Sequence, residues 1–221
     1  MHSSGFTRIL MSLVGVTLLS GCGMSVSKAM TRLSDPDPLK RQEAVLALTG
    51  RGQETYSQVH QVLLHDEQNF VRASAARALV QSGEVAWAAD GLKDRDELVR
   101  GQTAYVLGRY GGPEAPPYLL PAMAEEKNQT VRGFFIEASL RQRTRDFIPC
   151  LGRYLDSPEE EIRVRAMVAL GVISEKGLAL DVKRWKAWLN ENYPATPVAP
   201  ATPASPAVVP SPAAAPPSAT P

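Results

Sequence analysis

A short pattern recurs five times along the chain, and it limits the folds that the chain can adopt. Each copy places an acidic or hydroxyl residue six positions before an arginine, and four of the five arginines directly follow an apolar residue. The arginines are Arg41, Arg72, Arg100, Arg132 and Arg163, and the residues six positions earlier are Asp35, Asp66, Asp94, Glu126 and Ser157. The arginines follow one another at steps of 31, 28, 32 and 31 residues. A period of this size is typical of proteins built from stacked supersecondary units.

Apolar residues within each copy recur at helical spacing, which predicts a helix around each arginine, with the acidic or hydroxyl residue at its N-cap. Positions three and six after the arginine are mostly small, as in Ala75 and Ala78, so neighbouring helices can approach closely. We expect another helix before each capped one, over residues 27–33, 54–64, 85–92, 117–124 and 147–155, and a capping helix over 180–193. No segment alternates with the period of a strand. One helix pair cannot bury its own apolar face, so five pairs must stack.

The fifth copy shows a family resemblance. It reads Phe-Ile-Pro-Cys-Leu from residue 147, then Leu155-Asp156 and Ile162-Arg163. This order resembles HEAT repeats, in particular the short variety of phycobilisome-lyase-like HEAT proteins, and the resemblance covers residues 35–175. It implies an all-α solenoid of about five helix–turn–helix repeats. It also implies structural roles, in capping and in hydrogen bonds between repeats, for the rung residues Asp35, Arg41, Asp66, Arg72, Asp94, Arg100, Arg132 and Arg163.

The N-terminus predicts export and lipid attachment. Residues 9–19 form an apolar run behind Arg8, which is too short to span a bilayer core of ~20 residues but suits a signal peptide. The run ends in Leu-Ser-Gly-Cys22, which resembles the bacterial lipobox. This resemblance implies cleavage before Cys22 and diacylglycerol and acyl chains on its thiol, which would anchor the protein to a membrane. Gly23 stands where an Asp would favour inner-membrane retention, so by family analogy we expect the outer membrane, facing the periplasm.

The chain therefore divides into four predicted parts. These are a signal peptide over residues 1–21, a lipidated tether over 22–27, the solenoid over 28–193 and a tail over 194–221. The tail holds ten prolines and no Asp, Glu, Lys or Arg, so it cannot form a packed core and we expect it to be disordered. Prolines at 194, 197, 200, 203 and 206 have the period of polyproline II, which suits a spacer or a ligand of a proline-binding partner.

Few residues favour catalysis. His60 and His65 are five positions apart, whereas a metal-binding pair on a helix would be three or four apart. HEAT-repeat hydroxylases hold iron with His-Glu pairs, which this sequence lacks. Cys150, the one thiol besides Cys22, has no histidine nearby in the sequence, and we expect it to be a small buried residue. We therefore expect no enzymatic activity, no metal and no cofactor beyond the lipid on Cys22. Acidic and basic residues nearly balance, which argues against nucleic acid as a partner.

One surface is predicted to bind a protein. If the capped helices line the concave side, as in HEAT solenoids, positions two, five and nine after each arginine point outward together. The row comprises Arg77, Gln81, Tyr105, Arg109, Phe134, Glu137, Arg141 and Arg165. Arginine and aromatic residues are favoured at binding hot spots. The alternative is an ordinary solvated helix face, and an exposed Phe134 would favour binding.

These features favour a lipid-anchored HEAT-repeat protein of the cell envelope that acts as a protein-binding scaffold or assembly module. Two alternatives stay open. A lyase or isomerase relative would act on a bound chromophore or peptide, and it would need a pocket with converging polar groups around Cys150 or His60. A mechanical spacer would act through the proline-rich tail.

Overall fold

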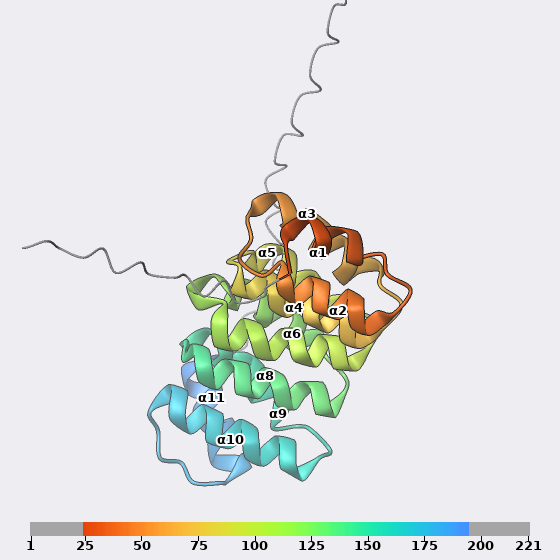
Figure 1. Ribbon diagram of the computed structural model, residues 1–221. Helices are drawn as coiled ribbons and strands as arrows, with labels where there is room; N and C mark the ends of the chain where they lie inside the picture. The colour runs from red at the N-terminus through yellow and green to blue at the C-terminus, as the bar shows by residue number, and fades with distance from the viewer. Residues whose placement is uncertain (1–23, 195–221) are drawn as a thin grey trace, which may run out of the picture.

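The computed structural model describes residues 24–194, which form helices and turns without a β-strand in that range. The first helices of the repeats are α1 (Val26–Arg32), α3 (Gln53–His65), α5 (Val85–Ala88), α7 (Pro116–Glu125) and α9 (Ile148–Tyr154). The second helices are α2 (Pro38–Ala47), α4 (Asn69–Gln81), α6 (Glu97–Tyr110), α8 (Gln129–Gln142) and α10 (Glu160–Ser174), and α11 (Val182–Asn192) follows them. The second helices succeed one another in one layer in front of the first helices (Figure 1). The predicted all-α solenoid is confirmed.

The predicted first helices agree with the structure to within a few residues. The expected helix over 85–92 is interrupted, because α5 passes after one turn into the 3-10 helix η1 (Ala89–Lys93). Gly91 of η1 lies so close to Thr103 of α6 that a Cβ on Gly91 would overlap the threonine side chain. Two further 3-10 turns, η2 (Gly112–Glu114) and η3 (Arg145–Phe147), precede α7 and α9.

The core runs continuously along the solenoid, between its two layers of helices. The position seven after each arginine is fully buried in every repeat, and it is occupied by Leu48, Leu79, Leu107, Ser139 and Leu170. Ser139 is the polar exception. Its hydroxyl donates to the carbonyl oxygen of Ile136 at 2.7 Å, so no hydrogen-bonding group is left unsatisfied where the other repeats carry leucine.

Small residues set the distance between α6 and α8, and of these only Ala138 stands at one of the predicted positions, six after Arg132. Gly108 of α6 faces Ala138 of α8, and a Cβ on Gly108 would lie 2.5 Å from the Cα of Ala138. Earlier on the same helix, Gly101 faces the ring of Phe134. The backbones of α6 and α8 can therefore approach closely only because these positions carry no side chain.

The predicted N-caps are wrong by two residues. The N-cap positions of the second helices are occupied instead by Asp37, Gln68, Asp96, Asn128 and Glu159, of which Asp37, Asp96 and Asn128 accept a capping hydrogen bond with the side chain. The acidic residue two positions earlier accepts a hydrogen bond from the backbone N–H of the N-cap residue, as Asp66 does from Gln68 at 2.9 Å. In the second, third and fourth repeats, this turn holds the carboxylate within hydrogen-bond distance of the arginine of the preceding repeat.

The two ends of the solenoid differ. At the start, α1 begins at Val26, where the side chain of Ser25 accepts from the N–H of Lys28. Helical structure therefore begins inside the predicted tether of residues 22–27. Cys22 and residues 195–221 lie outside the described residues. Between residues 24 and 194, no helix is long and apolar enough to cross a membrane.

At the other end, α11 packs against α9 in the opposite direction. Lys186, early in α11, pairs with Asp156 just after α9, and Leu189 lies against Gly152. Trp185 is buried, and its indole N–H donates to the carbonyl oxygen of Ala179 at 2.8 Å. Because of this reversed direction, α11 closes the stack and does not add a sixth copy of the repeat.

Candidate protein-binding surface

The arginines of the first three repeats each bind a carboxylate of the next repeat with two nitrogens. Arg72 is the most buried example, and its Nε and Nη2 donate to Asp94 at 2.7 and 2.9 Å. The other pairs are Arg41 with Asp66 at 2.7 and 2.9 Å and Arg100 with Glu126 at 2.8 and 3.2 Å. In each case Nη1 donates to the carbonyl oxygen six residues earlier, in the arginine's own repeat. Each of these arginines therefore links the loop before its own second helix to a carboxylate of the following repeat.

Glu126 of the fourth repeat is the last carboxylate that such an arginine binds. Its carboxyl is partly buried, which acts to raise its pKa. Hydrogen bonds from Arg100 and from the N–H of Asn128 outweigh burial and hold that pKa below its ordinary value.

The pattern changes after the fourth repeat, because the next repeat carries Ser157 where the others carry an acid. Arg132 Nε donates to the carbonyl oxygen of Glu126 at 2.9 Å, and the Ser157 hydroxyl donates to Gln129 at 3.2 Å. The guanidinium of Arg132 lies over the ring of Tyr154, 5.2 Å from the centroid.

Arg163 likewise has no acidic partner among the described residues, and its Nη1 donates to the carbonyl oxygens of Ser157 and Pro158, both at 2.8 Å. Asp35 at the other end has no preceding repeat among the described residues, and it accepts from the N–H of Asp37 at 2.9 Å. The paired rungs are thus confined to the first four repeats. Their geometry serves the stacking of repeats and leaves little of these groups exposed to a ligand.

The predicted binding row lies on the outer side of the second helices. At ~100° of rotation per residue, positions two, five and nine after each arginine fall on one side of the helix, opposite the buried positions. Arg77, Gln81, Arg109, Arg141 and Arg165 are exposed there, and Tyr105, Phe134 and Glu137 are half-buried. The structure therefore brings the eight residues to one side of the molecule.

Phe134 is half-buried, so the exposed ring that would favour binding is not present. Its ring covers Gly101 of α6, where an added Cβ would lie 2.7 Å from the Cδ2 of Phe134. The ring packs against the core and fills the space that the glycine leaves between α6 and α8. Phe134 is therefore foremost a packing residue.

Two arginines of the row are paired on their own helices. Arg141 Nη2 lies 2.9 Å from Glu137, and Arg165 lies 2.7 Å from Glu161. Both are exposed i, i+4 pairs, a class that contributes only ~0.5 kcal/mol to stability.

The row's arginines on α4 and α6 have no ion pair among the described residues. Arg109 has no carboxylate partner in the described chain; it donates weakly to the Tyr105 hydroxyl at 3.4 Å and lies over the Tyr110 ring at 5.3 Å. Arg77 likewise has no ion pair with any described residue. The guanidinium groups of Arg77 and Arg109 therefore remain available to a carboxylate of another molecule.

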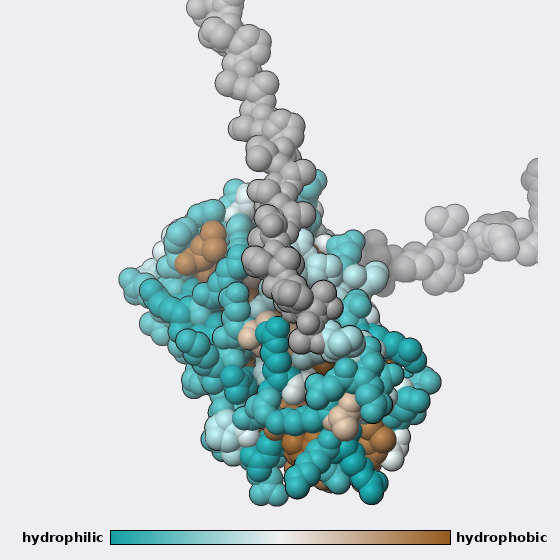
Figure 2. Space-filling view, turned by 180° about the vertical axis from the view of Figure 1, so that it is seen from behind, coloured by the Kyte–Doolittle hydropathy of each residue, from teal (hydrophilic) through white to brown (hydrophobic). Residues whose placement is uncertain are grey.

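Exposed apolar side chains on the same side were missed by sequence reasoning. They stand two before, five after or nine after the repeat arginines, so the same periodicity contained the signal. They are Leu39 at 60%, Leu46 at 47%, Leu98 at 45%, Val168 at 47% and Val172 at 45% exposure. We call the side formed by these residues and the predicted row the second-helix face. The opposite side of the molecule is mostly hydrophilic, with separate apolar patches at the upper left and near the lower end of the view (Figure 2).

A shallow hollow of about 430 Å³ lies on the second-helix face between α8 and α10. Leu140 and Val172 contribute its apolar part, and Glu137, Arg141 and Arg143 surround them. Two residues of the predicted row thus border a concave site. It suits an apolar side chain with a carboxylate beside it.

The residues considered for catalysis lie elsewhere. His60 Nε2 is 2.8 Å from Asp90 Oδ2, and its ring stacks on Trp87 with centroids 5.2 Å apart. Burial raises the pKa of the Cys150 thiol, which disfavours the reactive thiolate. Neither His60 nor Cys150 lines the hollow between α8 and α10. Among residues 24–194, no group of three or more His, Cys, Asp or Glu side chains is placed to hold a metal ion.

Comparisons with known proteins agree with this architecture. Residues 26–90 match the family model of HEAT repeats. A 95-residue stretch, 42% of this chain, is 35% identical to deoxyhypusine hydroxylase of Drosophila pseudoobscura pseudoobscura, and it spans about a third (32%) of that protein. The complex of CpcE and CpcF of phycocyanin lyase from Nostoc sp. PCC7120 contains a chain with a TM-score of 0.51 and 19% identity, over 75% of this chain and 71% of that one. This chain therefore contains HEAT repeats, and residues 24–194 fold as an α-solenoid of the HEAT type.

Proposed function

We propose that this protein is a scaffold or assembly module that binds a protein partner through its second-helix face. The observation that carries the proposal is the set of exposed leucines and valines that flanks Tyr105 and the unpaired arginines on that face. Exposed apolar residues grouped on one face mark interaction sites, and tyrosine and arginine are enriched among residues that dominate binding. The rung residues are excluded from this role because they are occupied within the stack.

The charges on the face indicate the chemistry of the partner. Arg77 and Arg109 have no carboxylate partner among the described residues, and the hollow beside Arg141 and Arg143 has an apolar floor. We infer a partner segment that carries carboxylates next to apolar side chains, because both features would be met at once. The similar fold in the CpcE–CpcF complex supports the pairing of such a solenoid with another protein.

The double variant Tyr105→Ala/Arg141→Ala tests this proposal. Wild-type protein, the double variant and a variant that lacks residues 195–221 are used to capture partners from detergent-solubilised envelopes. We expect the double variant to lose ~2 kcal/mol or more of binding free energy. Tyr105 also packs against the core, so circular dichroism is used to show that the wild-type protein and the double variant are both folded at the temperature of capture. The partner is then rebound to purified protein at low and high salt, and binding should weaken as salt increases. Normal capture by the double variant, with loss on tail deletion, would show instead that the tail is the binding element.

We also propose that Cys22 carries a lipid anchor that holds the solenoid at the outer membrane, on its periplasmic side. The lipobox-like sequence supports this, and the start of α1 at Val26 adds a geometric consequence. Four residues of extended chain span at most ~14 Å, so the N-terminal end of the solenoid would lie close to the bilayer. The variant Cys22→Ser should lose acyl labelling and fractionate away from the membrane. Unchanged labelling would contradict the anchor.

A second candidate function is that of a lyase or isomerase acting on a bound chromophore or peptide. The similarity to a phycocyanin lyase subunit and, over part of the chain, to deoxyhypusine hydroxylase favours it. Cys150 is the thiol in the described residues that such chemistry would use. Mass spectrometry of protein from its native host tests this candidate, because a covalent adduct on the Cys150 peptide would support it and an unmodified peptide would contradict it.

A further inference from the structure

A second concave site lies at the C-terminal end of the solenoid, away from the second-helix face. It has a volume of about 360 Å³ and forms where three segments meet. Arg145 comes from η3, residues 174–176 from the end of α10, and Trp188, Asn192 and Tyr193 from α11. The reversed direction of α11 is what brings its last turn beside Arg145. The volume falls within the range of small-molecule sites, ~300–1,000 Å³.

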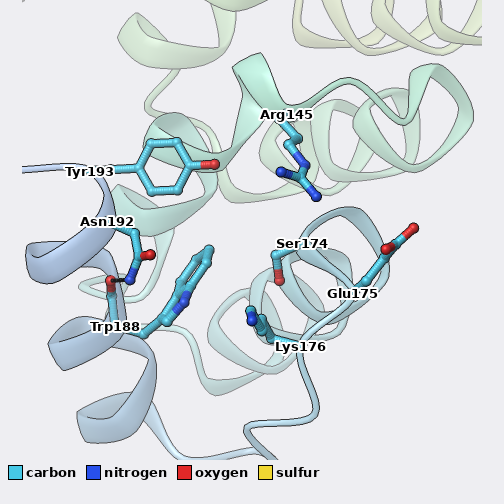
Figure 3. A pocket seen from close by; sticks show the side chains of 7 residues that line it. All are labelled: Arg145, Ser174, Glu175, Lys176, Trp188, Asn192 and Tyr193. Atoms are coloured by element: carbon cyan, nitrogen blue, oxygen red, sulfur yellow. Dashed lines mark hydrogen bonds between the residues drawn. The ribbon is translucent and has the colours of Figure 1, made fainter.

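The polar groups around this pocket are mainly unused donors. Arg145 and Lys176 have no ion pair or side-chain hydrogen bond with any described residue. Both side chains, with the Tyr193 hydroxyl, extend toward the space between α10 and α11, whereas the carboxylate of Glu175 points away from it (Figure 3). A space that faces two cations and a phenol, with the nearby acid turned outward, suits an anion.

The wall of the pocket adds an aromatic surface. Trp188 packs edge-on against Trp185 with centroids 5.7 Å apart, and it lies 5.6 Å from the ring of Tyr193. Two neighbours thus fix the orientation of the Trp188 indole, which stands between Asn192 and Lys176 (Figure 3). A flat apolar group of a ligand would find a fixed partner there.

The backbone beside the pocket is unusual. Within the described chain, the non-glycine residues with positive φ are Arg143, Glu175 and Ala179, at 52°, 60° and 57°. All three lie in the two segments that carry Arg145 and Lys176. Residues with a Cβ seldom adopt this conformation, and here it turns the chain at the ends of α8 and α10 so that the two cations follow directly.

We propose that this pocket binds a small anion attached to a flat ring, such as an aromatic phosphate or carboxylate. Arg145 and Lys176 bind the anionic group, Tyr193 donates a hydrogen bond to it, and Trp188 contacts the ring. No assigned role of the HEAT architecture requires these four residues together. The pocket shares no lining residue with the hollow between α8 and α10.

Titration of purified full-length protein tests the proposal, with the indole N–H resonance of Trp188 as the signal and Trp188→Phe to assign it. The probes are phenyl phosphate and benzoate, with inorganic phosphate and benzyl alcohol as single-feature controls. We expect at least one aromatic anion to shift this resonance to saturation and to bind at least tenfold more tightly than either control. Comparison of the two aromatic anions distinguishes a phosphate site from a carboxylate site.

The variants Arg145→Gln and Lys176→Gln should each weaken binding at least fivefold. Arg153→Gln is the matched control, because it removes the same charge from an exposed position on α9 that does not line the pocket; it should change binding less than twofold. Equal affinity in all three variants, or no shift of the Trp188 resonance, would overturn the proposal. A lower melting temperature in the two pocket variants with unchanged binding would also overturn it, because the cations would then serve only the C-terminal end of α10.

Discussion

Two arginines on the same helix show how the repeat separates structural from surface roles. Arg72 is 3% exposed and is held by both oxygens of Asp94 and by the carbonyl oxygen of Asp66 at 2.7 Å. Arg77, five residues later on α4, is exposed and free of ion pairs with other described residues. The contribution of an arginine to stability therefore depends on its position relative to the stacking interface, and is large for Arg72 and small for Arg77.

Arg72→Ala should destabilise the protein by ~3 kcal/mol or more, because it leaves the carboxylate of Asp94 buried without its counter-charge. Arg77→Ala serves as the control and should change the unfolding free energy by less than ~0.5 kcal/mol. Urea denaturation followed by circular dichroism measures both. Similar midpoints for the two variants would show that the buried rung does not hold the repeats together.

The contact between α6 and α8 leaves no room for a side chain at position 108. Gly108→Ala would normally favour a helix by ~0.5–1 kcal/mol, but here the new methyl group would meet the backbone of Ala138. We expect overpacking, at ~1–3 kcal/mol, to outweigh that gain and lower the melting temperature. Gly177→Ala is the control, since no atom lies within 4 Å of its added Cβ. A higher melting temperature for Gly108→Ala would contradict the close approach.

The elements themselves could largely be predicted from the sequence. The helical spacing of apolar residues predicted the second helices. The shortest step between repeat arginines is the 28 residues from Arg72 to Arg100. It corresponds to the repeat whose first helix is the single turn α5 followed by η1. The N-caps could not be placed, because an Asp two residues before the cap is as favourable in an Asx turn as at the cap itself. The turn forms even in the first repeat, where no described repeat precedes Asp35 and the N-cap is Asp37.

At the scale of the whole molecule, periodicity predicted which residues share a face but not what surrounds them. The packing of Phe134 on Gly101 depends on the separation of α6 and α8, which no pattern in one helix encodes. The polar pocket was missed for a similar reason. Arg145 and Trp188 are distant in sequence, and they meet only because α11 runs antiparallel to α9.

The central claim is that a protein partner binds the second-helix face. Site-specific photocrosslinking in intact cells tests it most directly, with the photoreactive residue at position 98, which is exposed on α6, or at position 58, which is exposed on α3 among the first helices. We predict a crosslinked species from position 98 whose partner is also recovered from position 168, at the same face on α10, and none from position 58. A partner that crosslinks from position 58, with none recovered from position 98 or 168, would contradict this claim.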